Sequence, residues 1–146
     1  MKKINLETSV GLFVVLGIVA LGYLSIRLGG LETFSKGRIL YAEFEKAGGI
    51  KPGASVEIAG VEVGKVKSIR LNDDYQALLE LSVEEKIEIQ EDAFASIKTK
   101  GLIGEKYVMI TPGGSDEIIP DSGKIRETES AVDIEELISK YVFGKI

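Results

Sequence analysis

The chain has 146 residues, of which 18 are Lys or Arg and 23 are Asp or Glu, giving a net charge of -5. Binding to nucleic acid relies on basic patches that neutralise phosphates, so this acidic balance argues against a nucleic-acid partner. The chain contains no Cys and no His, which excludes disulfides, thiolate or imidazole metal sites, and the usual Ser-His-Asp or Cys-His catalytic sites.

An uncharged apolar run near the N-terminus predicts a membrane-spanning helix. The run extends from Thr8 to Ile26, and its 19 residues would cover about 28 Å as a helix, close to the thickness of the hydrocarbon core. Tyr23 is suited to the membrane interface, and the long side chain of Arg27 can extend outward from it. We therefore predict a membrane anchor over residues 1–28.

The charges that flank this run predict its orientation. By the positive-inside rule, Lys2 and Lys3 hold the N-terminus in the cytoplasm, although Arg27 at the other end reduces the asymmetry. The alternative is a cleaved signal peptide, for which Ala20 and Gly22 supply small residues near a cleavage site. Signal peptides have an apolar region of only ~7–15 residues, so the longer run favours an uncleaved anchor.

A linker at residues 29–37 is followed by short β-type runs with Gly, Pro and Asn-Asp turns between them. We expect strand breaks at Gly60 and Gly64, and we place Tyr75 on the apolar face of its strand. Several short strands without an intervening helix indicate a small barrel or sandwich over residues 38–128. The predicted strands are Ile39–Glu45, Ser55–Ile58, Val61–Val63, Val66–Leu71, Tyr75–Val83, Ala93–Thr99 and Tyr107–Thr111.

The C-terminal residues 129–146 predict an amphipathic helix. Ser130 is a suitable N-cap, and Gly144 is a suitable C-terminal stop. The apolar stripe of this helix, about four turns long, could dock on the barrel of its own chain or pack with equivalent stripes in an oligomer. The residues of the stripe follow i, i+3, i+4, i+7 and i+8 spacing and are Ile134, Leu137, Ile138, Tyr141 and Val142.

An apolar pair lies where a loop tip between two strands is expected. Leu102 and Ile103 are bracketed by Gly101 and Gly104, whereas such tips are normally polar and exposed. The pair must therefore either turn into its own core or form an apolar contact surface. The loop lacks the Lys-Ser/Thr that follows the glycines of a phosphate-binding loop.

Two segments of the chain resemble the MCE-domain family, and within it the MlaD-type single-domain proteins. They are Pro52–Ile69 and Ala93–Gly114, and they lie in the family's order between an N-terminal anchor and a short C-terminal helix at Ser130–Gly144. The resemblance implies a mainly β fold, a small single-domain β-barrel. It also implies that the barrels assemble into a homohexameric ring around a central hole.

The resemblance further implies roles for the loop and for the partners. Gly101 and Gly104 would be hinges that turn the loop into the hole, where Leu102 and Ile103 would form an apolar, lipid-contacting collar. Relatives often carry two leucines here, and Ile103 keeps the surface apolar. The partners implied are phospholipid, the permease and ATPase subunits of an ABC transporter in the bacterial inner membrane, and a soluble periplasmic lipid carrier. The barrel would lie in the periplasm.

Two other classes of function compete with a lipid conduit. An adaptor of a periplasmic efflux-type assembly would normally carry a long coiled-coil hairpin, and the sequence has no sustained heptads. A membrane-tethered enzyme would need a convergent polar site, and pairs such as Asp73–Asp74 are more typical of solvated turns. The acidic pair after Gly114 lacks EF-hand spacing. We therefore predict no catalytic residue, no metal site and no cofactor.

Overall fold

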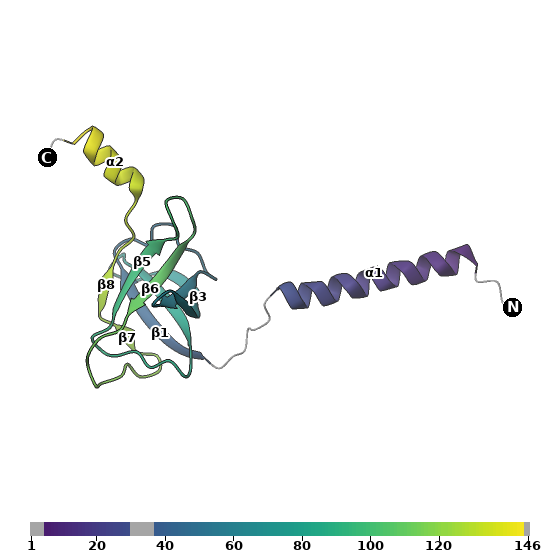
Figure 1. The fold of residues 1–146 in the computed structure, drawn as a ribbon, viewed down its shortest axis with the longest axis horizontal. Helices are drawn as coiled ribbons and strands as arrows, with labels where there is room; N and C mark the ends of the chain where they lie inside the picture. Colours follow the sequence, from purple (N-terminus) through teal and green to yellow (C-terminus); the bar gives the residue numbers. More distant parts are fainter. Residues whose placement is uncertain (1–4, 30–36, 145–146) are drawn as a thin grey trace. The chain divides into compact units, whose positions relative to one another are not determined.

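The computed structural model describes residues 5–29 and 37–144. Lys2, Lys3 and almost all of the predicted linker lie outside the described residues. The chain divides into two compact units, Met1–Ser35 and Lys36–Ile146, and each is described by itself. Figure 1 gives the order of the elements along the chain.

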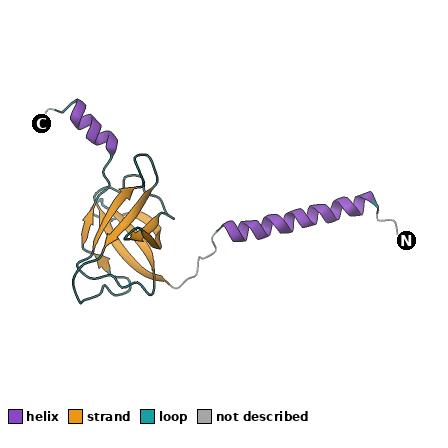
Figure 2. Cartoon of the chain, viewed as in Figure 1, coloured by secondary structure: helices purple, strands orange, loops and turns teal. Residues whose placement is uncertain are grey.

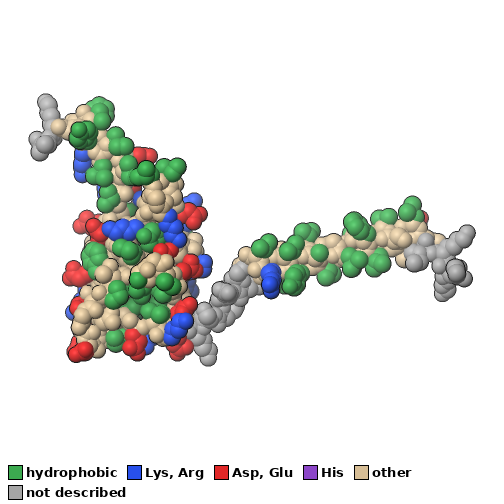
Figure 3. Space-filling model, viewed as in Figure 1, with side chains coloured by type: hydrophobic (Ala, Val, Ile, Leu, Met, Phe, Trp, Pro, Cys, Tyr) green, Lys and Arg blue, Asp and Glu red, His purple; other side chains and the backbone are tan. Residues whose placement is uncertain are grey.

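The first unit contains one long apolar helix, α1 (Leu6–Leu28). Its 23 residues rise about 35 Å, and its mean hydropathy of 2.3 makes it long and apolar enough to cross a membrane. Apolar side chains are exposed along its length, as Figure 3 shows in green. The helix extends two residues beyond each end of the predicted run, so that Glu7 and Arg27 lie in its first and last turns.

The second unit is built on one eight-stranded sheet (Figure 2). The strand order is β7-β1-β4-β3-β2-β6-β5-β8, which confirms the predicted mainly β, barrel-like fold. The strands, in chain order, are β1 (Gly37–Phe44), β2 (Ser55–Ile58), β3 (Val61–Leu71), β4 (Ala77–Glu84), β5 (Phe94–Thr99), β6 (Lys106–Thr111), β7 (Lys124–Ile125) and β8 (Glu127–Glu129).

Alternate residues of the strands face a single apolar core. This pattern follows from the two-residue period of a strand, in which every second side chain points to the same face. The alternation is clearest in β1 and β4, which pair along their whole length in antiparallel register. The core side chains of these two strands are Leu40, Ala42, Phe44, Leu79, Leu81 and Val83.

The two shortest strands close the sheet on itself. β7 pairs in parallel with β1, and β8 pairs in parallel with β5, although only Arg126 separates β7 from β8 in the chain. The hydroxyl of Thr128 donates a hydrogen bond to the carbonyl oxygen of Glu43 at 2.6 Å, and Ile125 is fully buried. One six-residue segment therefore joins the opposite edges of a nearly closed sheet, and it pairs with part of each edge that would otherwise present unpaired backbone groups.

The predicted break at Gly64 is wrong, because β3 runs through it without interruption. Gly64 pairs with Val83 of β4, and a Cβ at this position would overlap the carbonyl oxygen of Ser82. The glycine thus allows a close approach of two backbones inside the sheet. A β-bulge lies further along the strand, between Val66 and Ser68.

The prediction for Tyr75 is also wrong. β4 begins at Ala77, and Tyr75 lies in the preceding turn with a φ of 61° and 82 % of its surface exposed. The side-chain oxygen of Asn72 closes this turn by accepting hydrogen bonds from the backbone N–H groups of Asp74 (3.0 Å) and Gln76 (2.8 Å). The alternation of β4 therefore does not extend back into the turn.

The C-terminal helix, α2 (Ile134–Val142), has nine residues and is shorter than the predicted four turns. Ser130 is not its N-cap, because the Ser130 hydroxyl accepts a hydrogen bond from the backbone N–H of Lys46 at 3.1 Å. Ala131 is buried, and its N–H donates to the Lys46 carbonyl at 3.4 Å. These contacts hold the residues after β8 against the barrel, so the helix begins only after Asp133, which occupies the N-cap position.

A carboxylate fixes the loop after β6, and its removal should lower stability in a pH-dependent way. The Asp92 carboxylate accepts hydrogen bonds from the N–H groups of Gly114 (2.9 Å) and Ser115 (3.0 Å), which hold its pKa below the ordinary value. A lowered pKa in the folded state means that the stabilisation is complete above the unfolded pKa of about 3.9 and is lost as the pH falls through the folded pKa.

We therefore expect Asp92→Asn to lower the urea midpoint of unfolding at pH 7. The difference in midpoint between the variant and the original chain should shrink as the pH approaches 3. Urea titrations at several pH values, followed by circular dichroism, measure both effects. Asp116→Asn is the matched control, because that exposed side chain makes none of the described hydrogen bonds. If the difference in urea midpoint between Asp92→Asn and the original chain did not change with pH, the stabilising role of the ionised Asp92 carboxylate would be wrong.

Candidate functional site

The loop between β5 and β6 is a tight turn whose geometry requires its two glycines. The N–H of Lys100 donates to the carbonyl oxygen of Glu105 at 3.0 Å, which closes the loop. Gly101 has a φ of +71°, in the left-handed region that favours glycine. A Cβ at Gly104 would overlap the carbonyl oxygen of Lys100. A glycine at each of these two positions thus lets the chain reverse within so few residues.

The apolar pair at the tip of this loop is almost fully exposed. Leu102 is 81 % exposed and Ile103 is 100 % exposed. The alternative in which the pair turns into its own core is therefore wrong. Apolar surface in water costs about 25 cal/mol per Å², and two adjacent large side chains at a loop tip are typical of a contact surface.

A charged pair lies at the base of the loop. The ammonium of Lys100 is 2.7 Å from Oε1 of Glu57 and 5.4 Å from the centre of the Tyr107 ring. The Ser55 hydroxyl donates to the same carboxylate oxygen at 3.0 Å. The hydrogen bond from Lys100, and next the one from Ser55, lower the pKa of Glu57, and the carboxylate in turn raises the pKa of Lys100. The pair is therefore charged across the neutral range of pH.

The loop and α2 lie at the same end of the barrel. β5 runs into the loop, and β8 is parallel to β5, so the chain leaves both strands at one end of the sheet. β7 and β8 are nearly continuous and β7 is parallel to β1, so β1 runs in the same direction and Gly37 lies at the other end. The start of β1 and the loop after β5 are at opposite ends of the barrel in Figure 1.

The whole apolar stripe of α2 is exposed. The five residues of the predicted stripe range from 41 % exposed at Ile134 to 92 % exposed at Tyr141. Two ion pairs connect the start of the helix to the barrel, Lys46 with Glu136 at 3.2 Å and Lys106 with Asp133 at 3.1 Å. The stripe does not pack on the described part of its own barrel, which favours packing with another surface. Two further exposed apolar residues that the stripe prediction missed are Val132 and Phe143.

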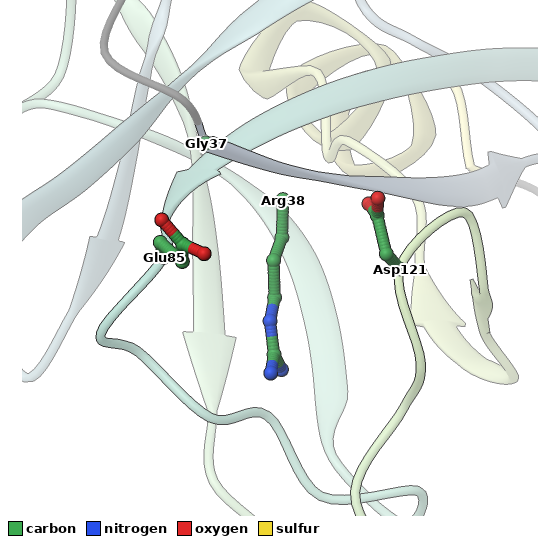
Figure 4. Close-up of a pocket in the computed structure, with 4 residues that line it drawn as sticks. All are labelled: Gly37, Arg38, Glu85 and Asp121. Atoms are coloured by element: carbon green, nitrogen blue, oxygen red, sulfur yellow. The ribbon is translucent and has the colours of Figure 1, made fainter.

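A pocket at the end of the barrel where β1 begins is polar, unlike the apolar surfaces of the β5–β6 loop and α2. It is lined by Gly37, Arg38, Glu85 and Asp121, and the Arg38 side chain lies between the two carboxylate side chains (Figure 4). Its lining is polar and charged, so it offers little surface to an apolar ligand. Over residues 5–29 and 37–144, no group of three or more His, Cys, Asp or Glu side chains is placed to hold a metal ion.

Comparison with known proteins identifies a family for this fold and loop. The sequence model of the MlaD protein family matches residues 36–113, which contain Pro52–Ile69 and all but the last residue of Ala93–Gly114. The "intermembrane phospholipid transport system binding protein MlaD" of Haemophilus influenzae is 35 % identical over 150 residues, covering 98 % of this chain and 90 % of that protein. The protein of the same description from Escherichia coli is 31 % identical over 147 residues, covering 94 % and 80 %.

A solved structure agrees with these relatives in fold. A chain of the Acinetobacter MlaFEDB complex in an ATP-bound conformation superimposes with a TM-score of 0.73 and 27 % sequence identity, covering 95 % of this chain and all of that chain. The match includes more than the barrel, since it covers nearly the full length. On the family match, the identity to its relatives and the fold, the chain belongs to the MlaD family of MCE-domain proteins.

Proposed function

We propose that the chain is a non-catalytic, membrane-anchored, lipid-binding subunit of an ABC-type phospholipid transport system. In this proposal it forms a homohexameric ring whose apolar pore is lined by Leu102 and Ile103. The observation that carries the proposal is the exposed apolar pair at the tip of the β5–β6 loop. The names of the relatives support the substrate class, because both describe binding proteins of phospholipid transport.

A ring of loops suits the chemistry of a phospholipid. Each CH₂ of an acyl chain that leaves water gains about 0.8 kcal/mol, so a lipid crosses an aqueous space readily only along an apolar wall. One loop offers two side chains and cannot surround two acyl chains. Six copies would place two apolar side chains each around one hole, and the glycines at 101 and 104 would let each loop turn toward it.

The partners and the location follow from the same proposal. A chain of an ATP-bound complex has this fold, which supports permease and ATPase partners that supply the energy. A soluble periplasmic carrier would exchange lipid with the ring. α1 would cross the bacterial inner membrane once with the N-terminus in the cytoplasm, and the barrel would lie in the periplasm. The exposed stripes of α2 would pack together to hold the ring, and could also extend its apolar path.

The mass of a fragment from Gly29 onward, measured by light scattering, tests the ring directly. We expect a species of about six chains, with phospholipid that can be extracted with organic solvent and identified by mass spectrometry. A stable monomer at micromolar concentration would count heavily against a ring, and a ring free of lipid would count against a lipid-binding pore. Hydrolytic turnover of added phospholipid would instead support an enzyme.

A further inference from the structure

The loop that carries the apolar pair has little packing of its own. Its two large side chains are directed into solvent, so burial cannot determine which way the tip points. A loop with few buried contacts opens at low free energy unless polar contacts at its base hold it. One such contact is the backbone hydrogen bond from Lys100 to Glu105, which closes the loop but does not attach it to the other strands.

The side chain of Lys100 makes that attachment across a neighbouring strand. Lys100 follows β5, whereas Glu57 belongs to β2, and β6 lies between these two strands. Adjacent strands are about 4.8 Å apart, so the Lys100 side chain must cross the width of β6 to reach the carboxylate at 2.7 Å. It passes the ring of Tyr107 on β6, with the ammonium 5.4 Å from the ring centre, within the range of a cation–π contact.

Glu57 is held in place more firmly than a surface carboxylate. Only 11 % of its side chain is exposed, and the Ser55 hydroxyl donates to it at 3.0 Å. The β2–β3 register shifts between Val56 and Glu57, and such an irregularity redirects a side chain. The hydrogen bonds from Lys100 and Ser55 outweigh the effect of burial and lower the pKa of Glu57, so the carboxylate is stabilised chiefly by these two partners.

A neighbouring ion pair is more exposed than the pair of Lys100 with Glu57. Lys98 lies two residues before Lys100, within β5, and pairs with Glu129 at 3.1 Å. Both of those side chains are well exposed, at 41 % and 48 %, so the pair is a typical surface contact that contributes little. The Lys100 pair instead joins an exposed lysine, which lies directly before Gly101, to a carboxylate that the barrel wall fixes.

We propose that Lys100 and Glu57 are positioning residues, which hold the loop against the barrel wall so that Leu102 and Ile103 keep one direction. This inference rests on the proposed function, since it assigns the direction of the loop a role in lipid passage. Lys100 acts through the position of the apolar pair and does not itself contact the acyl chains. Loss of the ion pair between Lys100 and Glu57 would leave Leu102 and Ile103 in the loop but without a fixed direction. Lipid transfer would then slow although the residues that line the pore are unchanged.

The experiment uses the full chain, whose lack of cysteine allows one label at one site. A spin label on Ile103→Cys reports the motion of the loop by electron paramagnetic resonance in detergent. Transfer is measured separately, without the label, as the release of a fluorescent phosphatidylethanolamine from proteoliposomes that contain the chain with its permease and ATPase partners. The variants are Lys100→Met and Glu57→Gln, and Lys98→Met is the matched control.

We expect Lys100→Met and Glu57→Gln each to increase the mobility of the label and to slow transfer by about fivefold, a loss of about 1 kcal/mol. Lys98→Met should change neither the mobility of the label nor the rate of transfer. Lys100→Arg should leave both near their original values, since it keeps the positive charge. Circular dichroism checks that each variant is folded, and Lys100→Met tests the idea even if Glu57→Gln does not fold, because the lysine is 52 % exposed.

The outcomes separate this inference from the proposed function. If Lys100→Met matches Lys98→Met in both measurements, or loosens the loop without slowing transfer, the positioning role is wrong although the collar can still be right. If polar replacement of Leu102 and Ile103 leaves transfer unchanged, the collar itself is wrong.

Discussion

Replacement of Leu102 and Ile103 together with Asn is expected to slow phospholipid transfer about tenfold or more while the barrel stays folded. A side-chain amide without a hydrogen-bond partner costs a few kcal/mol in an apolar environment, and 1.4 kcal/mol corresponds to a factor of ten. In a ring, every copy would bring two such amides to the path of the acyl chains. The fold should tolerate the change, because both side chains are exposed in the single chain and substitutions there usually alter stability by less than about 0.5 kcal/mol.

The measurement is the rate of fluorescent phospholipid release from proteoliposomes, together with the thermal midpoint of the variant. Leu71→Asn is a suitable control, because Leu71 is also a large exposed apolar residue but lies at the end of β3, outside the loop. It should leave transfer near its original rate. A double variant that transfers lipid at the normal rate would rule out the collar, and one that unfolds would show that the loop has a structural role that its exposure does not reveal.

Gly64→Ala is expected to lower the free energy of unfolding by about 3 kcal/mol, because overpacking costs about 1–3 kcal/mol and occasionally more. The added Cβ would overlap the Ser82 carbonyl oxygen and lie too close to Cα of Val83, and both are backbone atoms of a central strand. Side chains can change rotamer to relieve a clash, whereas backbone can move only by separating β3 from β4. The loss should therefore lie at the upper end of that range.

Urea denaturation of the fragment from Gly29 onward, followed by the β-sheet circular dichroism, measures this loss. Gly114→Ala is the matched control, since a Cβ there meets no atom within 4 Å and the position has no positive φ. That control should be neutral or slightly stabilising, because alanine restricts the unfolded chain. Equal midpoints for the two variants would mean that β3 and β4 can separate at Gly64 at little cost.

Features that depend on local pattern could be predicted from the sequence. The apolar run of α1 has no charge to interrupt it, and in β1 the side chains that face the core alternate with those that do not along consecutive residues. The two glycines of the β5–β6 loop also mark a turn by themselves, whatever surrounds it. The pattern could not decide whether the apolar pair between them was buried, since that depends on where the rest of the barrel lies.

Features that depend on distant residues could not be predicted. β7 and β8 have two and three residues and become strands only because they pair with β1 and β5. The start of α2 is delayed by contacts of Ser130 and Ala131 with Lys46, which is 84 residues before Ser130 in the chain. In the sequence, Gly64 looks like the end of a strand, and only its close approach to the backbone of β4 explains a glycine inside β3. The ion pair of Lys100 with Glu57 likewise links two motifs that look independent in the sequence.

The closure of the barrel by residues 124–129 has a consequence for the order in which the protein can be completed. β1 is the first strand to be synthesised, and it pairs on one side with β4 and on the other with β7. Until Lys124 has emerged from the ribosome and reached the barrel, the outer edge of β1 has no partner, and exposed strand edges template aggregation. The long separation between β1 and β7 also slows this step. A nascent chain that stalls before Lys124 would hold a nearly complete sheet with two open edges, so we expect such intermediates to be the ones that chaperones or proteases recognise.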